Sequence, residues 1–342
     1  MQMDHSKAIK RIGILTSGGD APGMNAAIRA IVIAAQHYQI ATIGFCAGYN
    51  GLIDDVSIPL NVSRVSDIIH KGGTILKSAR CPAMTTTLGI TQATTTLLKE
   101  KLDALIVIGG DGSFSGLLAL KEQWSGQVIG IPGTIDNDID GTDFTIGFST
   151  AINTAIEAID KIRDTAEAFE RIFIVELMGK HSGHIAFNVG IACAAEQVIS
   201  FENFPTAGNA ENNQASKLHA LVKEIKQAQA NRHASYIIVL AENVWQGGAS
   251  ALAQQLQTLA NIDCTACILG HIQRGGSPVS QDRILATKLG AYAVEQAITG
   301  QNNVMVGERN NQLVTIPIEL SWQQQKPLDE YLLKIQRQLL NL

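Results

Sequence analysis

Short apolar runs alternate with amphipathic stretches along most of the chain. The runs are rich in Ile, Val and Leu, and apolar and polar residues do not alternate within them. They cover Ile12–Thr16, Ala41–Phe45, Ala104–Ile108, Val128–Ile131, Ile172–Glu176, Tyr236–Leu240 and Cys267–Leu269. Continuous runs of this kind are typical of strands buried on both faces, in parallel sheets that helices cover. The pattern therefore predicts an α/β fold with doubly wound, mainly parallel sheets.

Helical periodicity fills several of the intervals between these runs. Thr150–Ala168 places isoleucines on one face and charged residues outside it, which predicts an amphipathic helix. Asn212–Ala230 and Ser280–Thr299 also predict helices, and Asp329–Leu340 predicts a surface helix that packs back on the protein. The stretch Pro205–Gln214 is rich in turn-forming and polar residues, so it predicts an exposed loop.

Length and composition limit the possible classes of protein. A chain of 342 residues favours about two domains, with a hinge near Gly141–Gly147. The content of 46% hydrophobic and 17% charged residues argues against disorder. A net charge of −5 argues against a nucleic-acid partner, because no basic surplus exists to neutralise phosphates. Met1–Lys10 lacks an apolar core and Ile185–Ala195 is too short to span a bilayer, so neither a secretory signal nor a membrane helix is expected.

Five cysteines, an odd number spread over a long chain, fit a reducing cytoplasm better than a disulfide framework. Cys264 and Cys267 form a C-x-x-C with His271 nearby, which leaves a zinc or redox role open. No second C-x-x-C completes four ligands, and the pair lies in an apolar run that predicts a buried strand. We therefore favour the interpretation that both cysteines are small buried hydrophobes.

Polar residues and glycines gather just after the predicted strands. The segments that follow six of the runs are Thr16–Asn25, Gly109–Ser113, Pro132–Asp138, Met178–Gly183, Glu242 and Gly270–Gly276. In open α/β sheets ligands bind beyond the carboxyl ends of the strands. The arrangement predicts a catalytic cleft at these ends.

Each segment has its own chemical interpretation. Gly18 and Gly19 allow backbone N–H groups to approach a phosphate, and a helix beginning near Met24 adds its positive dipole end, although a structural tight turn also fits. Asp111, between glycines, is placed to hold Mg²⁺ beside phosphates. Neither a Walker A lysine motif nor a G-x-G-x-x-G is present.

Two further pairs suit anion and proton chemistry. Asp136 and Asp138 are one residue apart, and an extended segment would direct both carboxylates the same way, so that one could take a proton. A turn is the alternative for this pair. His271 and Arg274, between glycines, could clamp an anion at a strand end.

Together, T-S-G-G-D-A-P-G-M-N, G-G-D-G-S, P-G-T-I-D-N-D and G-H-I-Q-R-G-G-S-P resemble the phosphofructokinase family, from about Ile12 to Thr299. The resemblance implies transfer of the ATP γ-phosphate to the 1-hydroxyl of fructose 6-phosphate, with Asp136 as the base and Thr134 and Asp138 beside the transferred group. It implies Mg²⁺ on Asp111 and ATP contacts at Gly19, Arg80, Cys81, Gly110, Asp111, Gly112 and Ser113. It implies substrate contacts at Thr134, Ile135, Asp136, Arg171, Met178, Gly179, Lys180, Glu242, His271 and Arg274.

The same resemblance implies the organisation of the protein. An ATP-binding domain is expected over residues 1–145 plus about 273–322, and a sugar-phosphate domain over about 146–272, with a C-terminal helix over 323–342. A cytoplasmic homotetramer is implied, in which Arg171 reaches the active site of a neighbouring subunit. A kinase for another sugar phosphate and a non-catalytic regulatory subunit are the alternatives, and the presence of both Asp111 and Asp136 argues against the second.

Glycine at positions 112 and 133 favours ATP as the donor, because the pyrophosphate-dependent branch usually has Asp and Lys there. Three positions depart from the family. Lys180 stands where an Arg usually stabilises the transferred phosphoryl group, Thr265 where a neighbouring subunit usually supplies an Arg, and Lys77 where Gly is usual. The effector pocket matches at Arg29, Arg163 and Glu196, whereas Ile33, Val56, Asn231 and His233 replace basic residues. Weak control by ADP or phosphoenolpyruvate is therefore expected.

Overall fold

The computed structural model describes residues 9–169, 171–204, 210–231, 235–323 and 326–339. The chain forms two compact units. Unit 1 comprises Met1–Ile135, Ile139–Thr150 and Arg274–Lys326, and unit 2 comprises Asp136–Asp138, Ala151–Gln273 and Pro327–Leu342. None of the described helices is long and apolar enough to cross a membrane.

Unit 1 is built on a seven-stranded sheet in the order β11-β10-β5-β4-β1-β2-β3. Its strands are β1 (Arg11–Thr16), β2 (Ala41–Phe45), β3 (Ser57–Leu60), β4 (Ala104–Gly109), β5 (Gln127–Pro132), β10 (Val304–Arg309) and β11 (Gln312–Pro317). The five central strands are parallel, and the edge strands β3 and β11 pair antiparallel with their neighbours. The carboxyl ends of β1, β4 and β5 therefore lie at one edge of the sheet.

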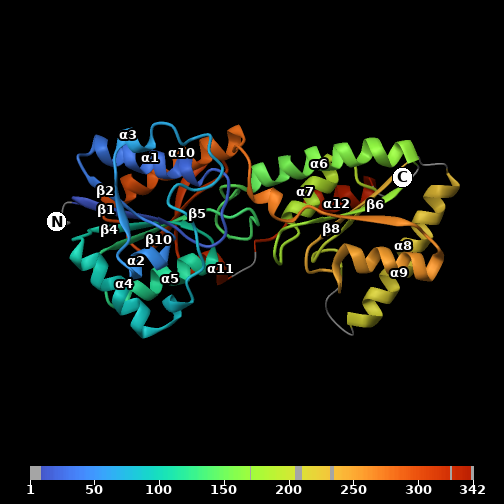
Figure 1. The fold of residues 1–342 in the computed structure, drawn as a ribbon, viewed down its shortest axis with the longest axis horizontal. Helices are drawn as coiled ribbons and strands as arrows, with labels where there is room; N and C mark the ends of the chain where they lie inside the picture. Colours follow the sequence, from blue (N-terminus) through green and yellow to red (C-terminus); the bar gives the residue numbers. More distant parts are fainter. Residues whose placement is uncertain (1–8, 170, 205–209, 232–234, 324–325, 340–342) are drawn as a thin grey trace. The chain divides into compact units, whose positions relative to one another are not determined.

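Helices cover both faces of this sheet. They are α1 (Met24–His37), α2 (Tyr49–Ile53), α3 (Val62–Val65), η1 (Pro82–Thr85), α4 (Thr87–Lys99), α5 (Asp111–Lys121), α10 (Ser280–Ile298) and α11 (Leu320–Gln323). Figure 1 shows α1 and α10 on one face and α4 and α5 on the other. α1 and α10 pack closely, because a Cβ at Gly290 would lie 2.6 Å from the carbonyl oxygen of Ala27.

Unit 2 is built on a four-stranded parallel sheet in the order β7-β8-β6-β9. The strands are β6 (Ile172–Leu177), β7 (Gln197–Ile199), β8 (Tyr236–Ala241) and β9 (Cys264–Ile268). Its helices are α6 (Phe148–Phe169), which begins in unit 1, α7 (His184–Ala192), α8 (Ala210–Ala230), α9 (Gly248–Ala260), η2 (Gly270–Arg274) and α12 (Glu330–Leu339). In Figure 1, α6, α7 and α12 lie on one face of the sheet, and α8 and α9 on the other.

The predicted fold class is confirmed, and the strands and helices taken from the apolar pattern are present within a few residues of their predicted bounds. Two predictions were wrong. The run around Cys264–Ile268 is an edge strand with Ile268 58% exposed, because a neighbour covers only one side of β9. Of the loop predicted over Pro205–Gln214, residues 210–214 belong to α8, and 205–209 lie outside the described residues.

Candidate active site

The loop after β1 brings a glycine and an arginine together in unit 1. Gly18 has φ +85°, a left-handed conformation that favours glycine. A Cβ at Gly19 would lie 2.5 Å from Nη1 of Arg274, so a side chain there would displace the guanidinium group. Arg274 also donates a hydrogen bond to the main-chain oxygen of Asp20 at 3.3 Å. Gly19, predicted for ATP, and Arg274, predicted for the sugar phosphate, are thus neighbours.

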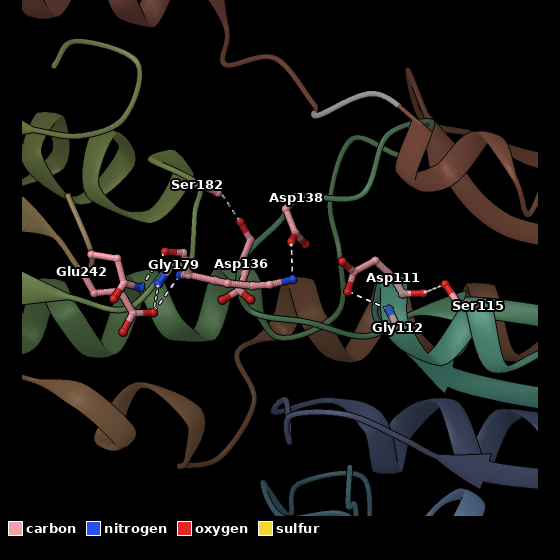
Figure 2. A network of polar contacts seen from close by, with 10 residues as sticks. Asp111, Gly112, Ser115, Asp136, Asp138, Gly179, Ser182 and Glu242 are labelled. Atoms are coloured by element: carbon pink, nitrogen blue, oxygen red, sulfur yellow. Dashed lines mark hydrogen bonds and ion pairs between the residues drawn. The ribbon is translucent and has the colours of Figure 1, made fainter. Parts of the chain in front are cut away.

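The N-terminus of α5 has no side-chain cap and has space beside Gly112. Its N-cap Gly110 supplies no side-chain cap, and the Asp111 carboxylate accepts the N–H of Gly112 at 2.7 Å (Figure 2). A Cβ at Gly112 would meet no atom within 4 Å. Helix N-termini attract phosphate through their N–H groups and dipole. The segment predicted to bind ATP thus lies at a helix N-terminus with space beside Gly112.

Gly133 differs from Gly112 in its surroundings. A Cβ at Gly133 would lie 2.9 Å from the Ile108 side chain and 3.2 Å from that of Met24. Core packing alone thus accounts for glycine at this position. The adjacent Thr134 is buried and lies beside Gly110, whose Cβ would be 3.8 Å from the Thr134 Cβ. Ile135, predicted as a substrate contact, is fully buried.

The segment that carries Arg80 and Cys81 is fixed to the glycine loop. The Ser78 hydroxyl donates to the main-chain oxygen of Gly18 at 2.7 Å, and the Gly18 N–H donates to Ala79 at 3.4 Å. Arg80 is exposed, and Cys81 is half-buried against the core. These contacts hold Ser78 and Ala79, which directly precede Arg80, against Gly18.

In unit 2, Asp136 and Asp138 flank Asn137, whose backbone is in the left-handed conformation. Asn137 has φ +52°, so the segment is not extended, and the assumption that an extended strand aligns the two carboxylates was wrong. Asp136 is 6% exposed, and its main-chain oxygen accepts the Ser182 hydroxyl at 3.0 Å (Figure 2). The Asp138 carboxylate lies 3.6 Å from the Lys180 ammonium group.

Glu242 holds the turn that carries Lys180. One carboxylate oxygen of Glu242 accepts the N–H groups of Gly179 at 3.1 Å and of Lys180 at 2.7 Å (Figure 2). Gly179 and Lys180 have φ values of +151° and +59°, and Asn243 donates to the Lys180 carbonyl at 2.9 Å. The fully buried Gln273 accepts the Met178 N–H at 2.8 Å. The predicted residues Met178, Gly179, Lys180 and Glu242 thus form one connected turn.

The remaining predicted residues are less connected. His271 is exposed in η2, and Arg171 is exposed with its guanidinium carbon 4.8 Å from the Phe169 ring centroid. Of the predicted effector residues, Arg163 and Glu196 are bonded to each other at 3.3 Å in unit 2, whereas Arg29 lies on α1 of unit 1.

Sequence reasoning missed Gln273, Ser182, Asn243 and Asp20. Asp20 accepts the N–H groups of Ala21 and Thr74 through its carboxylate. Burial raises the pKa of Asp20, and these hydrogen bonds and the charge of Arg274 oppose that rise. All four act on main-chain groups from a distance along the chain, a kind of contact that local pattern does not reveal.

No group of three or more His, Cys, Asp or Glu that could hold a metal occurs in the part of the chain that the structure describes. Mg²⁺ is commonly bound by one or two carboxylates plus phosphate oxygens, so the prediction of a metal at Asp111 does not require such a group.

The fold and these loops define a phosphoryl-transfer enzyme of the α/β class. Residues 11–297 match the family model described as Phosphofructokinase, so the chain belongs to the phosphofructokinase family. It is 45% identical to ATP-dependent 6-phosphofructokinase 1 of Thermus thermophilus, over 97% of this chain and 99% of the relative. It is 47% identical to ATP-dependent 6-phosphofructokinase of Clostridioides difficile, over 94% and 97%.

Solved structures give the same class. The phosphofructokinase of Saccharomyces cerevisiae superposes with a TM-score of 0.81 at 30% identity, over 91% of this chain. The match spans 44% of the yeast chain. A pyrophosphate-dependent phosphofructokinase from Marinobacter aquaeolei shares the fold, with a TM-score of 0.79 at 22% identity.

Proposed function

We propose that this protein is an ATP-dependent 6-phosphofructokinase that transfers the γ-phosphate of ATP to the 1-hydroxyl of fructose 6-phosphate in glycolysis. The observation that carries the proposal is similarity along nearly the whole chain to relatives of that name, at 45% and 47% identity. Phosphoryl transfer demands positioning and charge neutralisation more than covalent chemistry. The turns described above suit that demand.

Asp136 is the general base in this proposal. Its burial restricts the carboxylate, and the Ser182 hydrogen bond anchors its main chain. Asp136 takes the proton of the attacking hydroxyl as the new phosphorus–oxygen bond forms, and ADP leaves with the electron pair of the broken bond. Lys180 supplies a positive charge beside Asp138 for the transferred group, as a point charge without the planar fork of an arginine.

Asp111 is the residue that would hold Mg²⁺, which would neutralise charge on the donor phosphates when bound. Its position at the open N-terminus of α5 fits that role, because the same helix end attracts phosphate oxygens. Gly19, Arg80, Cys81 and the Gly110–Ser113 segment complete the donor side, and Arg274 and His271 belong to the acceptor side. We place the protein in the cytoplasm as a homotetramer to which Arg171 contributes across a subunit boundary.

A second candidate is a kinase for a different sugar phosphate. The observation in its favour is Thr265, an exposed neutral residue of β9 where the family resemblance implies an arginine for the 6-phosphate. A panel of sugar phosphates, assayed with ATP and Mg²⁺, distinguishes the two candidates by the ratio of kcat/KM.

Asp136→Asn tests the proposed chemistry. General-base catalysis contributes about 10²- to 10⁴-fold, so we expect kcat to fall by that factor while MgATP affinity and thermal stability stay unchanged. Asp67→Asn, at a largely exposed carboxylate, is the matched control and should be neutral. Wild-type protein that binds ATP without turning over any sugar phosphate would refute the proposal, and so would Asp136→Asn protein of near-normal kcat.

A further inference from the structure

A buried asparagine fixes the segment of residues 71–80 against the start of α1. Asn25 is fully buried, and its amide nitrogen donates to the carbonyl groups of Lys71 at 2.9 Å and Gly73 at 2.8 Å. Its amide oxygen accepts the Ile75 N–H at 2.8 Å. Both donors and the acceptor of this side chain are thus used on the backbone of one loop.

The glycine loop makes further bonds to the same segment. Thr16 donates to the carbonyl oxygen of Lys77 at 2.8 Å, and Ser78 donates to the Gly18 carbonyl at 2.7 Å. Asp20 accepts the Thr74 N–H at 3.4 Å. All these residues belong to unit 1, so the backbone of Lys77 is held beside the predicted phosphate loop.

Lys77 has a backbone conformation that does not suit lysine. Its φ is +58°, where a side chain crowds the backbone and where glycine or asparagine is preferred. The side chain is exposed, and within the described part of the chain its ammonium group forms no hydrogen bond or ion pair. The turn itself therefore gives no reason for lysine, and neither does an internal contact.

Lys101 offers a comparison within the same unit. It also is an exposed lysine with a positive φ, +52°. It follows the C-cap residue of α4. There the Lys101 N–H donates to the Leu98 carbonyl and the Leu102 N–H to the Leu97 carbonyl, which is a common way for a helix to end. Lys77, by contrast, ends no helix and directly precedes Ser78, whose hydroxyl donates to the Gly18 carbonyl.

From this placement we propose that Lys77 binds a phosphate of the donor nucleotide, with Thr16, Asp20 and Asn25 as the residues that position it. The inference rests on the proposed function, which supplies a nucleoside triphosphate as ligand. The phosphates of a nucleoside triphosphate carry several negative charges, to which Asp111 and Asp20 add. Arg80 is the cation already assigned to this side, so a second cation in the same loop strengthens binding. The long stem of lysine carries its charge from the strained backbone to the phosphate.

Equilibrium binding of MgATP, measured by calorimetry without sugar phosphate, tests the inference on four variants. Lys77→Gly removes the charge and the strain, and Lys77→Asn removes the charge with a residue that tolerates this φ. We expect both to weaken MgATP binding about tenfold, at the lower end for a charged hydrogen bond. Lys77→Arg should stay within about threefold of wild type, and Lys101→Gly should bind as wild type does.

Adenosine, which lacks phosphate, is the control ligand. Its affinity should be unchanged in Lys77→Gly and Lys77→Asn, and their melting temperatures should match that of Lys101→Gly. Unchanged MgATP affinity in both neutral variants would overturn the inference, and so would an equal loss of adenosine affinity, which indicates a disturbed loop. Wild-type protein that binds MgATP but phosphorylates no sugar phosphate contradicts the proposed function and leaves the Lys77 measurement interpretable.

Discussion

Arg163, one of the residues predicted for an effector site, makes several structural contacts within unit 2. From α6 it donates to the carbonyl oxygens of Cys193 at 2.9 Å and Ala194 at 3.1 Å, just beyond the end of α7. Its other terminal nitrogen donates to Ser235 and to Glu196, both at 3.3 Å. A cation at these carbonyl groups also complements the α7 dipole. We therefore predict that Arg163→Ala destabilises unit 2.

The magnitude follows from geometry and exposure. Hydrogen bonds to a charged group contribute about 1.5 to 3 kcal/mol each, but those at 3.3 Å are long and the Arg163 side chain is 23% exposed. Glu196 keeps the Ile237 N–H at 2.6 Å after the change, so its carboxylate retains a partner. We take a loss of about 2 to 3 kcal/mol in the free energy of unfolding. For a unit of this size that lowers the melting temperature by about 5 to 10 °C.

Thermal and urea unfolding of Arg163→Ala, Arg163→Lys and Arg64→Ala measures this loss. Lysine keeps the charge without the fork, so an intermediate loss is expected, and the exposed Arg64 should change little. Wild type should show only a small shift of its sugar-phosphate saturation curve with submillimolar ADP or phosphoenolpyruvate. The reasoning is refuted if Arg163→Ala unfolds as wild type does and instead abolishes a large effector response.

Two further predictions concern Gly112 and the C-x-x-C. A Cβ at Gly112 would meet no atom within 4 Å, so the carboxylate of Gly112→Asp should act by repulsion and raise the KM for ATP at least tenfold. The control Gly112→Asn introduces a near-isosteric neutral side chain and should change the KM far less. Equal effects of both substitutions would indicate an effect of shape and not of charge. Although β9 is an edge strand, Cys264 is half-buried against the core of unit 2, and this partial burial raises its pKa to about 12 and also raises the pKa of Cys267. At pH 8 the Cys264 thiolate fraction is then about 10⁻⁴, so iodoacetamide should label it on the order of 10³-fold more slowly than a free thiol, as read by peptide mass spectrometry, with the rate rising at higher pH. Labelling of Cys264 at the rate of a free thiol would contradict this account.

The sequence predicted the central strands best. β4 is buried at every position, and a short continuous apolar run is typical of such a strand in a covered parallel sheet. Four strands were not predicted: β3, β7, β10 and β11. Exposed positions dilute the apolar signal of the edge strands β3 and β11, whereas β7 and β10 are mostly buried and were overlooked although their residues are largely apolar. β9 shows the converse error, since its apolar residues suggested burial that its position at the sheet edge does not provide.

The candidate site divides in the same way. Residues in dense motifs, such as Asp111 and Asp136, could be selected because glycines and acids cluster beside strand ends. The contacts that fix the Met178–Lys180 turn could not be predicted, since Glu242 and Gln273 accept main-chain N–H groups more than 60 residues away. Such bonds depend on which strand ends become neighbours, and the sheet order of unit 2 is not encoded in any one segment.

Three glycines that the sequence analysis assigned to phosphate chemistry, Gly19, Gly112 and Gly133, have different surroundings in the structure. Gly19 leaves room for the Arg274 guanidinium, Gly133 for the packed side chains of Ile108 and Met24, and Gly112 faces open space. Because a Cβ at Gly133 would crowd the side chains of Ile108 and Met24, packing is a second reason for glycine there, and this glycine is weaker evidence on the phosphoryl donor. At Gly112 an added Cβ would meet no described atom within 4 Å, so packing does not account for glycine there and the phosphoryl donor is an explanation that can be tested. Gly112 is therefore the position that distinguishes ATP from pyrophosphate as the donor. Comparing kcat/KM for the two donors in Gly112→Asp tests this preference more directly than any change at Gly133.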